Sequence, residues 1–248
     1  MRERLKRIAP LRAAVIGLSD SFARGRVRQL WHWSTRGHFV RTRRVQAWLT
    51  EASDAPRALQ VGGGRHVIRE PGWANGDLIR GDIYLDAGKR MPIPSGSLDF
   101  VFTEQFFEHL SLEQGAVFLA ECHRVLRPGG VLRQSTPDLQ GLLSVYQDDN
   151  EHVSLDAAVE RHRVSHCSRD TTGVFGGARF LNDNFRLWGH QFIYDRRTLE
   201  DVTKRAGFSE LSWESFGASS IEFLQGRERH VGQPWLAQAY VQVLEARK

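Results

Sequence analysis

Three stretches of the sequence contain side chains that can bind a ligand or exchange a proton. They hold, in chain order, Glu104 with Glu108 and His109, then Asp138, then His190 with Tyr194. A neutral imidazole takes up a proton near pH 7, whereas a carboxylate offers two acceptor oxygens. We therefore treat His190 as the candidate base or orienting group of a catalytic site. Asp138, Tyr194 and Glu104 are its candidate partners, and a purely structural role for the histidine remains open.

A run of three glycines, Gly62–Gly64, follows the short apolar segment that ends at Val61. Glycines at the end of a strand permit a tight turn or a close approach of the backbone to a ligand. The run departs from the G-x-G-x-x-G pattern, and Pro71-Gly72 leave little room for a helix that would face a pyrophosphate. The loop therefore favours a ligand without phosphates, and a turn without any ligand is the alternative.

An aspartate, Asp77, lies 13 positions after Gly64, at the end of the next predicted strand. A carboxylate in this position can accept hydrogen bonds from both hydroxyls of a ribose. The alternative is an aspartate that caps a turn. Asp77 is therefore the candidate ribose ligand.

The spacing of His162, His166 and Cys167 would suit a metal ion on one face of a helix. No further ligand is evident nearby in the sequence. We therefore expect an exposed helix here, and the sequence predicts no metal site.

The elements that must position these residues alternate between strands and helices. The predicted strands are 57–61, 73–77, 82–86, 97–102, 131–136, 209–216 and 239–246, and the predicted helices are 112–126, 139–147, 154–166 and 197–206. This alternation predicts an α/β fold with a parallel sheet, whose ligands bind beyond the carboxyl ends of the strands. The long segment 139–190 after a strand end is predicted to form a substrate wall.

Six short motifs occur along the chain in a fixed order. They are Val61-Gly-Gly-Gly64, Gly72-Trp-Ala-Asn-Gly-Asp77, Glu108-His-Leu110, Leu126-Arg-Pro-Gly-Gly130, Thr136-Pro-Asp-Leu139 and Gly189-His-Gln-Phe-Ile-Tyr-Asp195. With these motifs the chain resembles the class I S-adenosylmethionine (SAM) dependent methyltransferases, and more narrowly a methyltransferase-type-11-like bacterial subgroup associated with glycan and natural-product pathways. The resemblance implies a Rossmann-like sheet with helices on both faces. It divides the chain into a basic helical extension at 1–50 and a methyltransferase domain at 51–248.

The resemblance also implies SAM as the cofactor and a set of residues that bind it. These are Val61, Gly62, Gly63, Gly64, Asp77, Leu78, Asp86, Ala87, Glu104 and His109. Relatives often carry Glu-His where this chain has Glu104-Gln105, so position 105 receives no role in proton transfer. The departure keeps open a SAM-binding subunit that is not catalytic and serves in dimerisation.

The implied reaction is O-methylation of a small-molecule or glycan acceptor in the cytoplasm, with methylation of nitrogen or carbon, or another reaction, as alternatives. Two cysteines among 248 residues suit a reducing compartment. The net charge of +5 divides into +10 over residues 1–48 and −5 over the rest. This basic segment is expected to contact anionic membranes rather than nucleic acid, and a homodimer is left open.

Overall fold

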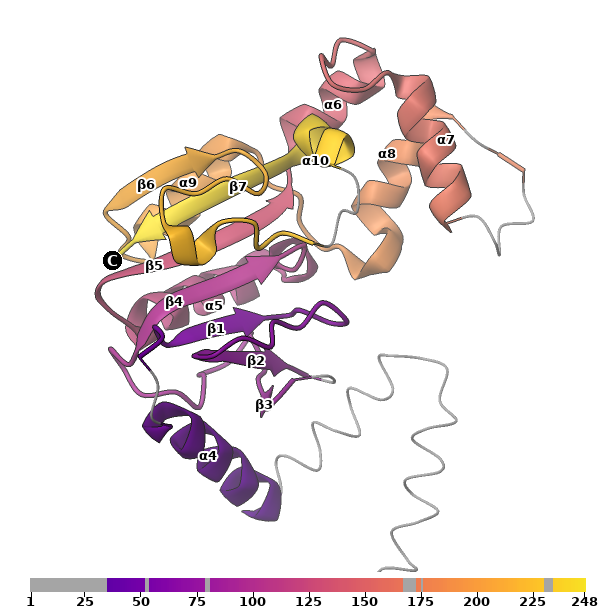
Figure 1. The fold of residues 1–248 in the computed structure, drawn as a ribbon. Coiled ribbons are helices and arrows are strands. Elements are labelled where there is room, and N and C mark those ends of the chain that lie inside the picture. The colour runs from indigo at the N-terminus through magenta and orange to yellow at the C-terminus, as the bar shows by residue number, and fades with distance from the viewer. Residues whose placement is uncertain (1–34, 52–53, 79–80, 167–172, 175, 230–233) are drawn as a thin grey trace, which may run out of the picture.

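The computed structural model describes residues 35–51, 54–78, 81–166, 173–174, 176–229 and 234–248 (Figure 1). Most of the predicted basic extension, residues 1–34, lies outside this range, as does Cys167. The end of the extension is helical, as predicted.

The described chain is built on one sheet of seven strands in the order β3-β2-β1-β4-β5-β7-β6 (Figure 1). The strands are β1 (Ala58–Val61), β2 (Trp73–Asp77), β3 (Ile83–Tyr84), β4 (Leu98–Glu104), β5 (Leu126–Pro137), β6 (Glu210–Glu214) and β7 (Val241–Arg247). Strands β1 to β5 pair in parallel, as the sequence predicts. Strand β7 runs antiparallel to both β5 and β6, so the sheet is mixed at this edge.

Helices account for most of the remaining described chain. They are α4 (Thr35–Thr50), α5 (Leu112–Val125), α6 (Leu139–Gln147), α7 (Leu155–His166), α8 (Gly177–Arg186), α9 (Arg196–Arg205) and α10 (Pro234–Tyr240), with the 3-10 turns η1 (Phe107–His109), η3 (Leu187–Gly189) and η4 (Glu222–Leu224). The structure confirms the predicted helices 112–126, 139–147, 154–166 and 197–206 to within one residue at each end. Helix α8 was not predicted, and α10 takes in the first two residues of the predicted strand 239–246, the rest of which is β7. None of these described helices is long and apolar enough to cross a membrane.

The two faces of the sheet are covered in different ways. Val101 of β4 belongs to the main apolar cluster, which also contains Phe118 of α5 and Leu199 of α9. Its neighbour Phe102 points to the opposite face and packs in a separate cluster with Leu224 of η4. Successive side chains of a strand alternate between faces, so this pattern is the expected one. The segment that contains η4, residues 217–229, is called the strap below.

The connection between β1 and β2 is a loop, and no helix forms in residues 62–72, all of which are described. The side chain of Gln60 holds this loop against the sheet. Its Oε1 accepts from the Ile68 amide at 2.9 Å, and its Nε2 donates to the His66 carbonyl at 2.9 Å. The buried Asn75 side chain donates to the Ile68 carbonyl as well, at 2.9 Å. The structure thus agrees with the short connection that Pro71-Gly72 predicts.

Helices α6, α7, α8 and α10 gather beyond the carboxyl ends of β4 and β5 (Figure 1). They share a small apolar cluster, which includes Leu142 and Val145 of α6, Ala158 of α7, Phe180 of α8 and Ala239 of α10. The segment 139–190 therefore forms a helical layer above the end of the sheet where ligands are expected.

Candidate active site

The glycine run and Asp77 lie at one edge of the sheet. In the parallel register, Val61 pairs with Gly76 on one side and with Thr103 on the other. The residues that directly follow these positions, Gly62, Asp77 and Glu104, therefore emerge side by side at the carboxyl ends of three adjacent strands. This is the arrangement that the sequence predicts for a ligand site.

Gly62 and Gly64 both have backbone conformations that favour glycine, with φ of 72° and 55°. A Cβ atom at Gly62 would lie 2.1 Å from the Phe106 ring, whereas one at Gly64 would meet nothing within 4 Å. Gly62 is therefore required for close packing against Phe106. Gly64 leaves open space in front of the backbone at the strand edge, which suits a bound ligand.

The other predicted cofactor residues follow β2 and β3. Asp77 is partly exposed, and the next side chain, Leu78, is 39% exposed and offers apolar surface. Asp86 forms an ion pair with Lys89 at 3.0 Å and accepts from the Gly88 amide, beside the buried Ala87. Their roles in binding stay predictions.

A cavity of about 390 Å³ separates the ends of β4 and β5 from the helical layer. Its walls are formed by Gln105, Glu108, His109, Pro137, Ala158, Arg161, His162, Phe180, Asn184, Trp188, His190, Leu236 and Tyr240. Residues 139–190 supply about half of this lining, which supports their predicted role as a substrate wall.

His190 is fixed in the cavity wall with one ring nitrogen toward a backbone carbonyl. Its Nδ1 lies 2.5 Å from the carbonyl oxygen of Asn184, so Nδ1 carries the proton of the neutral ring and Nε2 keeps a lone pair. Burial lowers the pKa of His190, and the hydrogen bond to Asn184 opposes this effect. The imidazole is therefore held neutral and oriented, which a proton acceptor requires.

Glu108 lies beneath His190 and is completely buried. Its Oε2 accepts from the Thr136 hydroxyl at 2.9 Å, whereas Oε1 lies 3.9 Å from His190 Nε2 and has no hydrogen-bond partner in the described chain. Burial raises the pKa of Glu108 to about 7. The structure therefore places Glu108 directly behind the candidate base.

Gln105 has an unusual backbone conformation and lines the cavity. Its φ of 47° is left-handed, a conformation that non-glycine residues adopt rarely and that often marks functional sites. Its Nε2 atom is buried and makes no hydrogen bond within the described part of the chain. The side-chain amide at position 105 is thus available to a molecule in the cavity.

Asp138 and Tyr194, the predicted partners of His190, do not line the cavity. Asp138 caps α6 by accepting from the Gln140 amide at 3.2 Å, and burial raises its pKa. Tyr194 is fully buried, its ring is stacked on Phe107 at 4.8 Å, and burial raises its pKa to about 12. The expectation that Tyr194 lies beside His190 at the reacting groups therefore does not fit the structure, since its ring belongs to the core.

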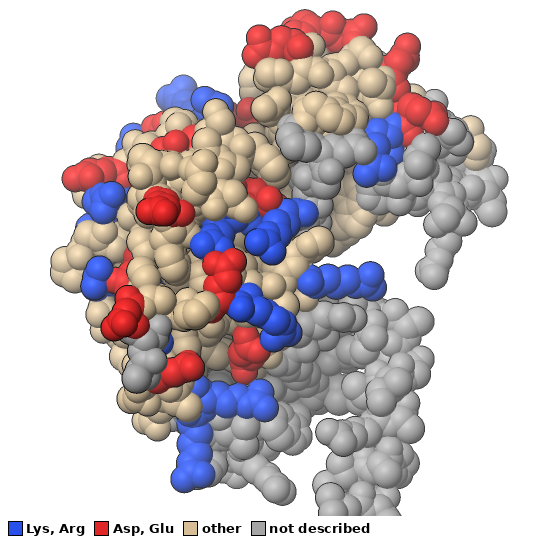
Figure 2. All heavy atoms as spheres, in the orientation of Figure 1, with Lys and Arg blue, Asp and Glu red and all other residues tan. Residues whose placement is uncertain are grey.

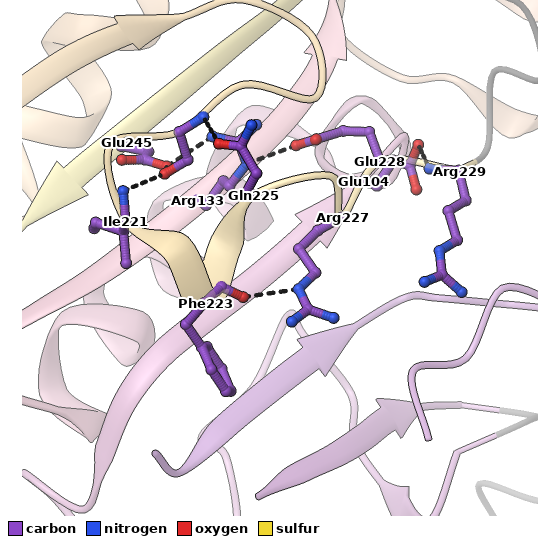
Figure 3. A network of polar contacts seen from close by, with 10 residues as sticks. Glu104, Arg133, Ile221, Phe223, Gln225, Arg227, Glu228, Arg229 and Glu245 are labelled. Atoms are coloured by element: carbon purple, nitrogen blue, oxygen red, sulfur yellow. Dashed lines mark hydrogen bonds and ion pairs between the residues drawn. The ribbon is translucent and has the colours of Figure 1, made fainter. Parts of the chain in front are cut away.

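Glu104, the fourth predicted catalytic residue, is 5% exposed at the end of β4. Its Oε1 accepts from the backbone amide of Arg229 at 2.8 Å (Figure 3). The carboxylate therefore ties the strap to the strand that leads into the site.

The predicted exposure of the helix that carries His162 is wrong at that residue. His162 is 7% exposed, and its Nε2 lies 2.6 Å from Oδ2 of Asp183 on α8. Arg179 donates to the same carboxylate oxygen at 2.7 Å. The histidine thus joins α7 to α8 and lines the cavity, whereas the side chain of His166 and all of Cys167 lie outside the described residues.

Comparisons with known proteins find similarity to methyltransferases. Residues 65–133 match the family model of a methyltransferase domain. A probable S-adenosylmethionine-dependent methyltransferase of Mycolicibacterium smegmatis is 50% identical over 48 residues, which make up 19% of this chain and 18% of that protein. An uncharacterized 37.1 kDa protein in a transposon of Streptomyces fradiae is 27% identical over 124 residues, or 50% of this chain and 34% of that protein. The chain thus spans about a third or less of the length of these curated relatives.

Among solved structures, a SAM-dependent methyltransferase from Archaeoglobus fulgidus aligns with 92% of this chain and 100% of its own, at 16% identity and a TM-score of 0.46. The order of the seven strands and the antiparallel β7 are those of the Rossmann-like class I methyltransferase fold. Residues 65–133 are therefore similar to a methyltransferase domain, and SAM is the cofactor that this similarity implies.

Proposed function

We propose that the protein transfers the methyl group of SAM to a hydroxyl of a small-molecule or glycan acceptor bound in the cavity beside His190. The observation that carries this proposal is the fixed, neutral imidazole of His190 in the wall of a 390 Å³ cavity. The cavity lies at the carboxyl ends of β4 and β5, on the same edge of the sheet as the glycine run and Asp77 at the ends of β1 and β2.

The residues at this edge fit SAM. The backbone of Gly62–Gly64 borders open space, Asp77 offers a carboxylate for the ribose hydroxyls, and Leu78 offers apolar surface. When bound, SAM supplies an electrophilic methyl group on a sulfonium. The protein therefore has to align the acceptor and receive its proton.

His190 is suited to receive that proton. A hydroxyl attacks as its O–H bond breaks, and the lone pair of His190 Nε2 can take the proton while Nδ1 stays hydrogen-bonded to Asn184. An acceptor nitrogen that carries a lone pair needs no base during its attack. The basic nitrogen in the wall therefore favours O-methylation over N-methylation.

The character of the walls favours an acceptor with a ring and several polar groups. Trp188, which lines the cavity, is 45% exposed, so an aromatic face is available for stacking on a ring. Arg161 and Gln105 add hydrogen-bond donors to the lining. A sugar or an aromatic natural product combines these features.

The test is turnover of SAM by His190→Ala and His190→Gln with a panel of hydroxyl-bearing sugars and aromatic compounds. Loss of the base should lower kcat by roughly 10²-fold in both variants, because an amide orients a hydroxyl but does not take its proton. SAM affinity, measured by calorimetry, should stay near that of the parent. Parental kcat in His190→Gln would contradict the role of His190 as the base.

A further inference from the structure

We propose that Glu108, His109 and His190 form a binding site for a divalent transition-metal cation, with Zn²⁺ as the ion that their donor atoms suit best. The site lies in the wall of the acceptor cavity. Binding of the cation does not require methyl transfer to occur, so this inference and the proposed function can fail separately.

The three side chains bring their donor atoms together in one place. One nitrogen of each imidazole and one carboxylate oxygen all lie within 4.8 Å of one another. The two rings face each other edge to face, with centroids 4.8 Å apart. Two histidines and one glutamate are a donor set of zinc sites that keep a further position open for water or substrate. Small side-chain rotations would bring these atoms to the distances of about 2 Å that Zn²⁺ requires.

The buried carboxylate of Glu108 lacks a partner on the side that faces the histidines. Its Oε1 makes no hydrogen bond to any described residue, although the side chain is 0% exposed and Oε2 is bound by Thr136. A buried carboxylate oxygen without a donor is costly, and such oxygens are normally hydrogen-bonded or bound to metal. The separation of 3.9 Å between Oε1 and His190 Nε2 is too long for a hydrogen bond. A shared cation between the two atoms would satisfy both.

The second nitrogen of His190 has the contact expected of a metal ligand. Nδ1 lies 2.5 Å from the Asn184 carbonyl oxygen and therefore donates its proton there. Histidines that bind metal almost always donate their other ring N–H to a carbonyl or carboxylate, which fixes the tautomer and the ring orientation. Asn184 thus directs the lone pair of Nε2 toward Glu108.

Backbone hydrogen bonds hold the two segments that carry the ligands in register. The Glu108 carbonyl accepts from the Gln191 amide at 2.8 Å and from the Phe192 amide at 3.2 Å. The Gln191 side chain also donates to the His109 carbonyl at 2.8 Å. Residues distant in sequence are therefore fixed side by side, so the donor set is assembled before an ion arrives.

A cation and a proton are alternative occupants of His190 Nε2, because that nitrogen has one lone pair. The metal-loaded protein would therefore lose His190 as a base. The three ligands lie in the wall of the cavity that Gln105 and Trp188 also line.

The test uses the untagged full chain after chelator treatment. It is titrated with Co²⁺, whose visible absorption reports the ligand geometry, and with Zn²⁺ in competition with a chromophoric chelator. We expect a single saturable site in the parent. His190→Gln, His109→Gln and Glu108→Gln should each weaken Zn²⁺ binding by about 10²-fold or more, because each removes one ligand.

The matched control is His152→Gln, which removes a partly exposed histidine from outside the cluster and should bind Zn²⁺ as the parent does. Circular dichroism checks the fold of each variant, and the partly buried His109, which is not among the core residues, provides a ligand substitution that leaves the core intact. Equal Zn²⁺ affinity of the parent and the three ligand variants would overturn the site, as would absence of saturable binding. SAM-dependent transfer by the metal-free chain tests the proposed function independently.

Discussion

At the scale of single residues, burial decides what the polar side chains around the cavity can do. Glu108 and Tyr194 are both fully buried, and burial raises their pKa values to about 7 and about 12. Glu108 directs Oε1 toward His190 in the cavity wall, so this buried carboxylate belongs to the candidate site. Tyr194 stacks on Phe107 in the core, and its backbone carbonyl accepts from Leu139. Tyr194 therefore connects the start of α6, at Leu139, to the turn η1, at Phe107.

The carboxylate of Asp77 is expected to determine SAM affinity. Asp77→Ala removes a charge-assisted pair of hydrogen bonds to the ribose, which should cost about 2 to 3 kcal/mol of binding free energy. Calorimetric titration with SAM measures this loss directly. Asp54→Ala, at an exposed aspartate before β1, is the control and should bind like the parent. Unchanged affinity in Asp77→Ala would remove this residue from the ribose site.

At the scale of elements, the strap is held to the sheet by a buried charge network (Figure 3). The Arg133 guanidinium on β5 donates to Glu228 and to Glu245, each at 2.7 Å, and the Arg133 and Glu228 side chains are 0% exposed. Arg227 of the strap reaches Glu70 in the loop after β1 at 2.6 Å. The strap thus links the loop beside the predicted SAM site to the centre of the sheet.

Removal of one charge from this network should destabilise the fold strongly. Glu228→Gln leaves the buried Arg133 with a single carboxylate partner, and breaking a buried ion pair typically costs about 3 kcal/mol or more. Urea unfolding followed by circular dichroism gives the loss in unfolding free energy. The control, Asp201→Asn, breaks an exposed pair with Arg205 and should change stability little. A parental unfolding midpoint in Glu228→Gln would show that the network contributes no net stability.

The elements that sequence patterns missed have weak or misleading local signals. Helix α8 contains Asn182, Asp183 and Asn184, which have low helix propensity. The tertiary contact of Asp183 with His162 stabilises this helix, and no local pattern encodes that contact. Helix α10 begins at Pro234 and joins directly to β7, so its apolar residues were assigned partly to the strand. Elements with clear periodicity, such as α5, were predicted almost to the residue.

At the scale of the whole molecule, the sequence predicted that the glycine run and Asp77 follow the ends of two strands, because neighbouring residues along the chain encode these features. It did not predict the cluster of Glu108, His109 and His190, because the turn η1 and the residue that follows the turn η3 meet only in the tertiary structure. On the face shown in Figure 2, charged side chains of both signs are interspersed over the described chain. Most of the +10 segment lies outside the described residues, so its contact with anionic membranes stays a prediction.

The central claim is that the glycine run and Asp77 bind SAM, next to a cavity for the methyl acceptor. The most direct test is calorimetric titration of the purified full chain with SAM and, separately, with NAD. The account predicts saturable binding of SAM and none of NAD, because the loop after β1 lacks the helix that would receive a pyrophosphate. Binding of NAD without binding of SAM would contradict the account.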